Sequence, residues 1–137
     1  MDGTHFCDST GLHNPDHYST AKDMAVLLQY ALKNDTFREI AESPWHSTPG
    51  TNVHPDGITY YSTMFKNLSD PSVTGGKILG GKTGFTNAAG SCLASFAEIE
   101  GVEYILVTAG AMDGGTPNIT DAVTVYNRLG EAAQALK

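Results

Sequence analysis

The chain has 137 residues, a length that fits one domain, and 40% of them are apolar, as in globular rather than disordered proteins. The formal net charge of −7 argues against binding to nucleic acid or to an anionic membrane surface. No run of about 18 apolar residues is present, which excludes a membrane-spanning helix, and no signal peptide is visible.

The first part of the chain predicts an ordered loop followed by two helices. Residues 1–19 are rich in turn formers, which predicts an ordered loop. Thr20 can cap the first helix, with Asp23 in the capping-box position, and Asn34 can close the last turn. A second short helix is expected from Thr36 to Glu42, before Pro44. The apolar residues of the first helix recur at helical spacing: Ala21, Met24, Ala25, Leu28, Ala31 and Leu32.

The second part predicts mainly strands. A small hairpin is expected within residues 45–61, from strand segments Trp45–Thr48 and Gly57–Tyr61, and a helical turn from Ser62 to Leu68. The tight Glu100-Gly101 link predicts an antiparallel hairpin between the last two strands. Three longer apolar runs have strand character: Gly76–Thr86, Ser91–Ile99 and Val102–Ala111.

A final helix is expected to begin near Pro117, with Asp121 in its first turn. Its buried face would carry Ile119, Ala122, Val123, Tyr126 and Leu129. The fold class predicted from these elements is α/β of the mixed α+β kind, with antiparallel sheet strands and flanking helices.

The segment from Gly80 to Gly90 contains the triplet Lys82-Thr83-Gly84. Serine-acylating enzymes of the penicillin-binding type carry this triplet on a strand beside their nucleophile. Three common residues often meet by chance, but here glycines precede the triplet, and an aromatic residue and a threonine follow it. Ala-Gly-x-Cys-Leu, from Ala89 to Leu93, then begins the next apolar run. The extended segment resembles the serine-type D-alanyl-D-alanine carboxypeptidases, the low-molecular-mass penicillin-binding proteins that trim peptidoglycan stem peptides.

A second stretch carries the same resemblance. Thr4-His5-Phe6-x-Asp8-x-x-Gly11-Leu12, with His17-Tyr18-Ser19-Thr20-Ala21-x-Asp23-Met24-Ala25 after it, is similar to the region between the family's second and third motifs. The family also needs Ser-x-x-Lys and Ser-x-Asn motifs upstream, and no Ser-x-Asn occurs here. We therefore expect residues 1–137 to be the C-terminal portion of a catalytic domain with part of the β-lactamase/penicillin-binding-protein-like transpeptidase fold.

The resemblance implies an activity for the parent enzyme. A serine would be acylated by the penultimate D-alanine carbonyl, D-alanine would leave, and water would hydrolyse the acyl-enzyme. The implied partners are stem peptides ending in D-Ala-D-Ala, β-lactams that act as acylating inhibitors, and the missing N-terminal half of the domain. No metal or other cofactor is implied, and the implied location is the cell envelope, outside the cytoplasm. The chain alone lacks the nucleophile, so we expect it to be inactive and to associate with itself through uncovered strands.

By the same resemblance, Lys82 supplies positive charge to the substrate carboxylate and Thr83 donates its hydroxyl to it. The backbone N–H of Phe85 would be one donor of the oxyanion hole. Because neighbouring side chains on a strand point to opposite faces, Lys82 and Thr83 can serve one ligand only if it lies along the strand edge as an added strand. Gly84 has no side chain to obstruct that ligand. Residues 71–90 contain Lys77 and Lys82 but no Asp or Glu, which suits a carboxylate.

Other patterns have simpler interpretations. Ser19-x-x-Lys22 formally fits the nucleophile motif, but helix capping explains its serine and threonine. His5, His13 and His17, with Asp8 and Asp16 between them, match no compact zinc pattern and favour a hydrogen-bonded loop. Cys7 and Cys92 could form a disulfide in an oxidising compartment, although a cysteine in an apolar run is more often buried and inert.

Two alternative functions stay open. A β-lactamase-related hydrolase would share the triplet, although the residues from Ala89 to Leu93 speak against it. A non-catalytic, peptidoglycan-binding or structural domain could reuse half of the fold. Many relatives also place an arginine after the third strand run, where it helps to hold the terminal carboxylate. Residues 112–120 contain no arginine or lysine, so carboxylate recognition would depend on Lys82 and Thr83.

Overall fold

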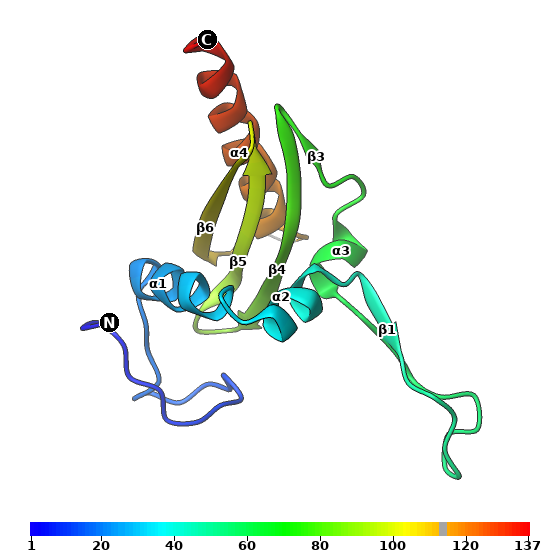
Figure 1. The fold of residues 1–137 in the computed structure, drawn as a ribbon. Helices are drawn as coiled ribbons and strands as arrows, with labels where there is room; N and C mark the ends of the chain where they lie inside the picture. Colours follow the sequence, from blue (N-terminus) through cyan, green and yellow to red (C-terminus); the bar gives the residue numbers. More distant parts are fainter. Residues whose placement is uncertain (113–114) are drawn as a thin grey trace.

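The computed structural model describes residues 1–112 and 115–137. A four-stranded antiparallel sheet, in the order β3-β4-β5-β6, lies at its centre (Figure 1). The strands span Ser72–Val73 (β3), Gly76–Thr86 (β4), Gly90–Ile99 (β5) and Val102–Ala111 (β6). The long strands agree with the predicted runs, with β5 beginning one residue earlier. The two-residue β3 was not predicted.

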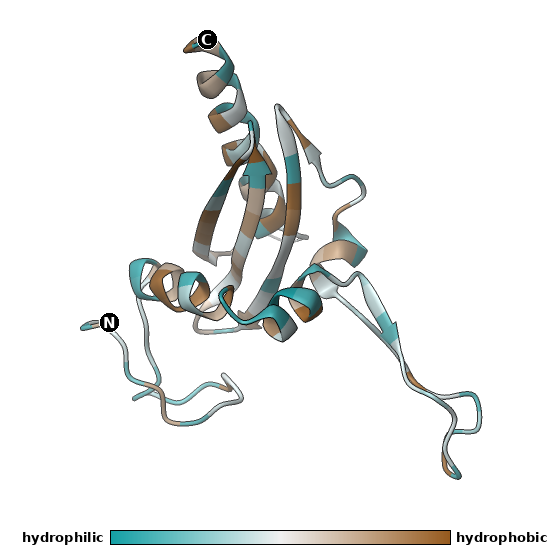
Figure 2. Cartoon of the chain, in the orientation of Figure 1, coloured by the Kyte–Doolittle hydropathy of each residue, from teal (hydrophilic) through white to brown (hydrophobic). Residues whose placement is uncertain are grey.

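Helices cover both faces of this sheet (Figure 1). On one face lie α1 (Ala21–Ala31) and α2 (Asp35–Glu42), which pack on Phe96 and Leu79. On the other lie α3 (Thr63–Asn67) and the long α4 (Pro117–Ala135). Figure 2 shows hydrophobic segments along the central strands, where both helical layers meet them. The predicted mixed α+β class, with an antiparallel sheet and flanking helices, is confirmed.

The larger core forms between α4 and the sheet. Tyr126 is buried there, and its hydroxyl lies 3.1 Å from Ser95 Oγ. Burial raises the pKa of Tyr126 to about 12, although the hydrogen bond with Ser95 opposes this shift. The buried residues of this cluster are Met64, Leu68, Val73, Ile78, Leu93, Ala97, Ile99, Ile119, Ala122 and Tyr126. The predicted apolar face of α4 is therefore the packed face, with Val123 and Leu129 at its margin.

Two tight contacts fix α4 against the strands. Gly130 packs so closely on the β3–β4 turn that a Cβ there would lie 1.9 Å from the carbonyl oxygen of Thr74. Asn127 Oδ1 accepts hydrogen bonds from the N–H and hydroxyl of Thr74. At the β5–β6 turn, Glu100 and Gly101 have φ angles of 51° and 76°, as in a type I′ turn. This confirms the predicted hairpin.

The helix termini correct three details of the predictions. Thr20 caps α1 as expected, because its hydroxyl accepts from the N–H of Asp23 at 3.0 Å. The Asp23 side chain does not complete the capping box and instead accepts hydrogen bonds from the N-terminal loop. Asn34 caps the start of α2 rather than the end of α1, because its Oδ1 accepts from Phe37 N–H. Asp121 lies beyond the first turn of α4.

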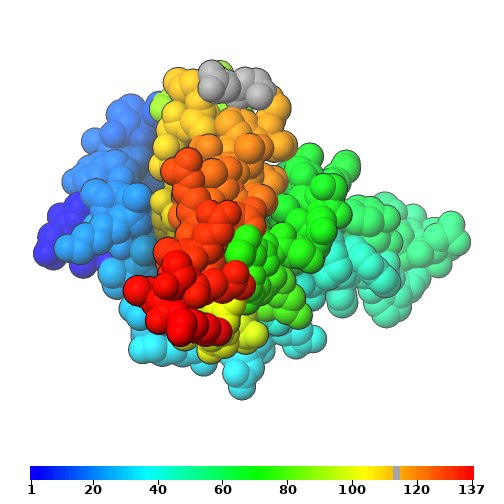
Figure 3. Space-filling view, turned by 90° about the horizontal axis from the view of Figure 1, so that it is seen from above, coloured from blue at the N-terminus to red at the C-terminus, as the bar shows by residue number. Residues whose placement is uncertain are grey.

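A short hairpin extends from the body of the molecule (Figures 1 and 3). Its strands are β1 (Trp45–Ser47) and β2 (Thr59–Tyr61), which pair antiparallel and are shorter than predicted. Ser62 follows β2 directly and caps α3. No helix within residues 1–112 and 115–137 is long and apolar enough to cross a membrane.

We expect the chain to associate with itself. It exposes 9020 Å², whereas a compact monomer of 14.5 kDa exposes about 6,900 Å². The outer edge of β6 has no partner strand among the described residues, and an open edge of this kind is a template for another chain. Light scattering over a dilution series should give a mass above 14.5 kDa that rises with salt, because salt screens the repulsion between copies of charge −7. A monomer at every concentration would contradict this expectation.

Candidate active site

The predicted site residues lie on the outer part of β4. The short β3 pairs only with Gly76 and Lys77, at the start of β4. From Gly80 to Thr86, β4 pairs with β5 on one side and with no described strand on the other. Lys82, Thr83, Gly84 and Phe85 therefore lie along an open strand edge.

The ladder register shows which backbone groups point to this open edge. The N–H of Ile78 donates to the carbonyl of Pro71 at 2.8 Å and so points away from β5. Opposed residues in an antiparallel pair alternate between bonding each other and pointing away. The β5 partners of Ile78, Thr83 and Phe85 are Ala97, Leu93 and Ser91. Ala97, Leu93 and Ser91 are separated by even numbers of residues along β5, so their backbone groups have the same orientation. The N–H and carbonyl groups of Thr83 and Phe85 therefore point away from β5, as those of Ile78 do, and towards the open edge.

The side chains of Lys82 and Thr83 lie on opposite faces, as their strand spacing predicts. Lys82 is opposite Ala94, which packs with the α1 layer, whereas Thr83 is opposite Leu93, which packs with the α4 layer. Lys82 Nζ donates to the backbone carbonyl of Thr83. The exposed ammonium group thus lies beside the backbone groups of the open edge.

The glycines of β4 fall into two kinds. A Cβ on Gly80 would lie 2.5 Å from the carbonyl oxygen of Ala41, and one on Gly81 would lie 2.7 Å from the carbonyl oxygen of Ala94 and 2.9 Å from Met64 Sδ. Close packing against α2, α3 and the neighbouring strand β5 therefore accounts for both of these glycines. A Cβ on Gly84 would have no described neighbour within 4 Å. Space next to Gly84 is open, as the approach of a ligand to the backbone requires.

A groove of about 680 Å³ lies beside these residues. All four predicted site residues contribute to its lining, together with α3 and the start of α4. Lys82 is the only charged side chain among the described lining residues, so the groove is locally positive on an acidic protein. The lining consists of Thr63, Asn67, Lys82, Thr83, Gly84, Phe85, Ser91, Met112, Gly115, Thr116, Asn118 and Ile119.

The far walls of the groove were not identified from the sequence. Asn118, in the first turn of α4, is buried and donates from Nδ2 to the carbonyl of Cys92 at 2.9 Å, which ties α4 to the strand beside β4. Thr63 and Asn67 contribute from α3. No local motif marks these residues, because tertiary packing alone brings them to the groove. Residues 113–114, in the segment without arginine or lysine, lie outside the described residues.

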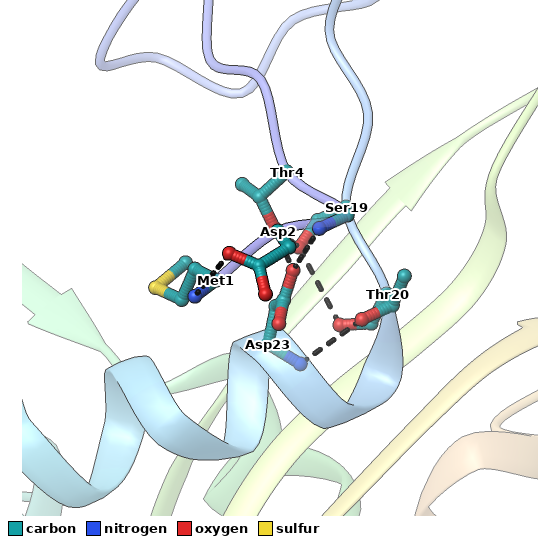
Figure 4. Close-up of polar contacts among 7 residues, drawn as sticks. Met1, Asp2, Thr4, Ser19, Thr20 and Asp23 are labelled. Carbon is teal, nitrogen blue, oxygen red and sulfur yellow. Dashed lines mark hydrogen bonds and ion pairs between the residues drawn. The ribbon is translucent and has the colours of Figure 1, made fainter.

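The N-terminal loop is held to α1 by Asp23. Its Oδ2 accepts from Gly3 N–H at 2.9 Å and from the Thr4 hydroxyl at 2.7 Å (Figure 4). Thr4 Oγ1 also lies 2.9 Å from Ser19 Oγ, so Ser19 takes part in this loop network and is absent from the groove lining. The hydrogen bond from Thr4 is the main cause of the lowered pKa of Asp23, and burial opposes it.

The lowered pKa makes a pH-dependent contribution to stability. The Asp23 carboxylate should stabilise the fold above its unfolded pKa, near 3.8, and this contribution should be lost as the pH falls through the lower folded value. We expect Asp23→Asn to lower the unfolding temperature at pH 7 and to have a smaller effect below about pH 3. Thermal unfolding of both proteins from pH 2 to 7 measures the difference. An equal effect at every pH would contradict the assigned role of the charge.

The remaining polar residues of the loop have structural partners. His5 Nδ1 lies 2.6 Å from the carbonyl oxygen of Asp16, and His17 Nδ1 accepts from the N–H of Cys7 at 3.2 Å. These contacts confirm a hydrogen-bonded loop for His5 and His17. Cys7 and Cys92 are both free thiols, the first exposed and the second partly buried, so they do not form a disulfide.

Comparisons with known proteins identify the family and the fold. A family model described as D-alanyl-D-alanine carboxypeptidase matches residues 1–113. No curated protein matches the chain. Among solved structures, a D-alanyl-D-alanine carboxypeptidase from Mycobacterium tuberculosis aligns with a TM-score of 0.70 at 24% identity, over 90% of this chain and 46% of that one.

Two structures of a Streptomyces DD-transpeptidase are also similar. The crystal structure of the enzyme gives a TM-score of 0.72 at 24% identity, over 92% of this chain and 48% of that chain. A mutant gives 0.74 at 25% identity, over 90% and 46%. The chain thus has part of the transpeptidase fold and spans about half the length of these structures. With the family model matching most of the chain, it belongs to the D-alanyl-D-alanine carboxypeptidase family of serine peptidases.

Proposed function

We propose that the open edge of β4 binds a peptide ending in D-Ala-D-Ala, within an enzyme that removes the terminal D-alanine from peptidoglycan stem peptides in the cell envelope. The observation that carries this proposal is the coincidence of the Lys82 ammonium, the Thr83 hydroxyl and the outward backbone groups of Phe85 at one edge that has no partner strand among the described residues. The peptide would add as a strand, with backbone hydrogen bonds supplying affinity and Lys82 recognising the terminal carboxylate.

The same edge has a part in the reaction. When a serine attacks the penultimate carbonyl, negative charge develops on its oxygen, and an outward N–H stabilises that charge. Phe85 supplies one such donor in this proposal. The nucleophile and the residue that activates it would come from Ser-x-x-Lys and Ser-x-Asn motifs. Since these 137 residues contain no Ser-x-Asn, and Ser19 of their Ser19-x-x-Lys22 lies in the N-terminal loop network and not in the groove lining, the chain by itself should form no penicillin adduct.

Isothermal calorimetry on the chain tests the binding step. A peptide ending in D-Ala-D-Ala should bind, and the peptide ending in L-Ala-L-Ala should bind more weakly. Gly84→Ala should reduce the affinity by about tenfold, because the added methyl group occupies the ligand's approach, without a change in unfolding temperature.

Lys77→Ala is the matched control for this experiment. Lys77 is exposed on the same strand, in the same acid-free segment, but does not line the groove. Its replacement should leave the affinity unchanged. Equal affinity for both peptides, or equal losses in Gly84→Ala and Lys77→Ala, would remove the support for a peptide site at this edge.

A further inference from the structure

The hairpin formed by β1 and β2 presents two aromatic rings and two hydroxyls on one face. Trp45 pairs with Tyr61 and Ser47 pairs with Thr59, and alternate residues on a strand share a face. Ser47 Oγ lies 2.6 Å from Thr59 Oγ1. These four residues line a shallow hollow of about 210 Å³. Trp45 is 58% exposed and Tyr61 is 67% exposed, so both rings are accessible to a ligand.

The hairpin is nearly free of charge. Residues 44–61 contain Asp56 as their one acidic residue and no lysine or arginine, on a chain of net charge −7. Phosphate groups and anionic membranes are recognised by lysine and arginine, so these ligands do not fit this face. A neutral ligand with apolar and hydroxyl surfaces does fit it. Sugar rings have both, because their C–H faces stack on aromatic rings and their hydroxyl and amide groups hydrogen bond to side-chain hydroxyls.

The hairpin is continuous with the groove. Tyr61 precedes the groove residue Thr63 by two positions, so their Cα atoms lie within about 7.6 Å. The N–H of Ser62 donates to the carbonyl of Pro44 at 2.9 Å, which fixes the base of the hairpin at the start of α3. A ligand that places a peptide in the groove can therefore extend a covalently attached glycan along the hairpin.

We propose that the hairpin face formed by Trp45, Ser47, Thr59 and Tyr61 binds the neutral N-acetylated amino-sugar chain that carries the stem peptide. This inference rests on the proposed function, because the peptide in the groove identifies the attached glycan. The rings of Trp45 and Tyr61 stack on the sugar faces, and the Ser47–Thr59 hydroxyl pair exchanges hydrogen bonds with the substituents of the sugar. The hairpin thereby directs the enzyme to peptides that are attached to a glycan strand.

The single tryptophan of the chain, Trp45, is a direct reporter for this face. Titration with a soluble tetramer of N-acetylglucosamine should change its fluorescence in a saturable way. Tyr61→Ala and Thr59→Val should each weaken binding by about tenfold, the second by loss of a hydroxyl with little change of shape. Tyr60→Ala is the matched control, because Tyr60 is 58% exposed on the opposite face of the same strand, and its affinity should be unchanged.

Three results would overturn the proposal. They are the absence of a saturable change, an equal loss in Tyr60→Ala and Tyr61→Ala, and the same fluorescence change with neutral phosphatidylcholine vesicles, which would assign the face to a membrane. Calorimetry with the D-Ala-D-Ala peptide on the same preparation separates this proposal from the function of the groove. If peptide binding persists and sugar binding fails, the hairpin inference alone is wrong. If sugar binding persists and peptide binding fails, the proposed function of the groove is wrong and the sugar site of the hairpin is retained.

Discussion

Lys82→Ala is expected to abolish most of the acylation by penicillin in a protein that joins this chain to a Ser-x-x-Lys segment. Lys82 is the only charged side chain among the described residues of the groove lining. Its removal leaves the carboxylate of the ligand without a positive partner in a site where fixed charges favour the transition state. Loss of one such electrostatic group lowers rates by about a hundredfold or more. In the 137-residue chain, the same change should weaken D-Ala-D-Ala peptide binding by about tenfold.

The fold should tolerate this substitution. Lys82 is exposed and its Nζ bonds only to the carbonyl of the next residue, so no described tertiary contact is lost. Rates of labelling by a fluorescent penicillin, measured with unfolding temperatures, separate a chemical role from a structural one. Lys77→Ala again serves as the control. An unchanged labelling rate in Lys82→Ala would make Lys82 a solvated surface lysine and would remove it from the site.

Phe96→Ala is expected to destabilise the chain by about 3–5 kcal/mol, a large part of the total stability of a domain of this size. Phe96 is completely buried between β5 and the α1 layer, where Leu28 and Leu32 pack on it. The guanidinium of Arg38 lies 5.3 Å from its ring, and Arg38 also forms a two-pronged ion pair with Glu103. Loss of the ring would leave a cavity where α1 and α2 dock.

Urea denaturation followed by circular dichroism measures this effect. Phe85→Ala is the matched control, because Phe85 is 68% exposed and is not among the buried residues of the core. We expect that change to alter the free energy of unfolding by less than about 0.5 kcal/mol. Similar losses for the two phenylalanines would show that Phe96 does not hold the helical layer to the sheet.

Much of this structure could be predicted from the sequence because local patterns determine it. The apolar run of β5, the Glu100-Gly101 turn and the Thr20 cap are each specified within a few residues, and all three are present. Prediction failed where a distant partner decides the outcome. Asp23 fits a capping box, yet its carboxylate bonds to Gly3 and Thr4, some twenty residues away in sequence.

The candidate site shows the same division. The triplet and its flanking residues identified one wall of the groove, because a short motif carries that chemistry. The walls from α3 and α4 have no motif and depend on how Met64 packs on Gly81 and how Asn118 bonds to β5. The sequence likewise could not show that Gly84 differs from Gly80 and Gly81. That difference appears only when the neighbours of each glycine are known.

The central claim is that the outward backbone groups of Thr83 and Phe85, beside the Lys82 ammonium, form a binding edge for a peptide carboxylate. Nuclear magnetic resonance of the ¹⁵N-labelled chain, titrated with a peptide ending in D-Ala-D-Ala and with its C-terminal amide, tests this claim most directly. We predict that the free acid shifts the amide signals of Thr83, Gly84 and Phe85, and that the C-terminal amide, which lacks the charge, shifts them much less. Shifts that avoid β4, or that are equal for the two peptides, would contradict the claim.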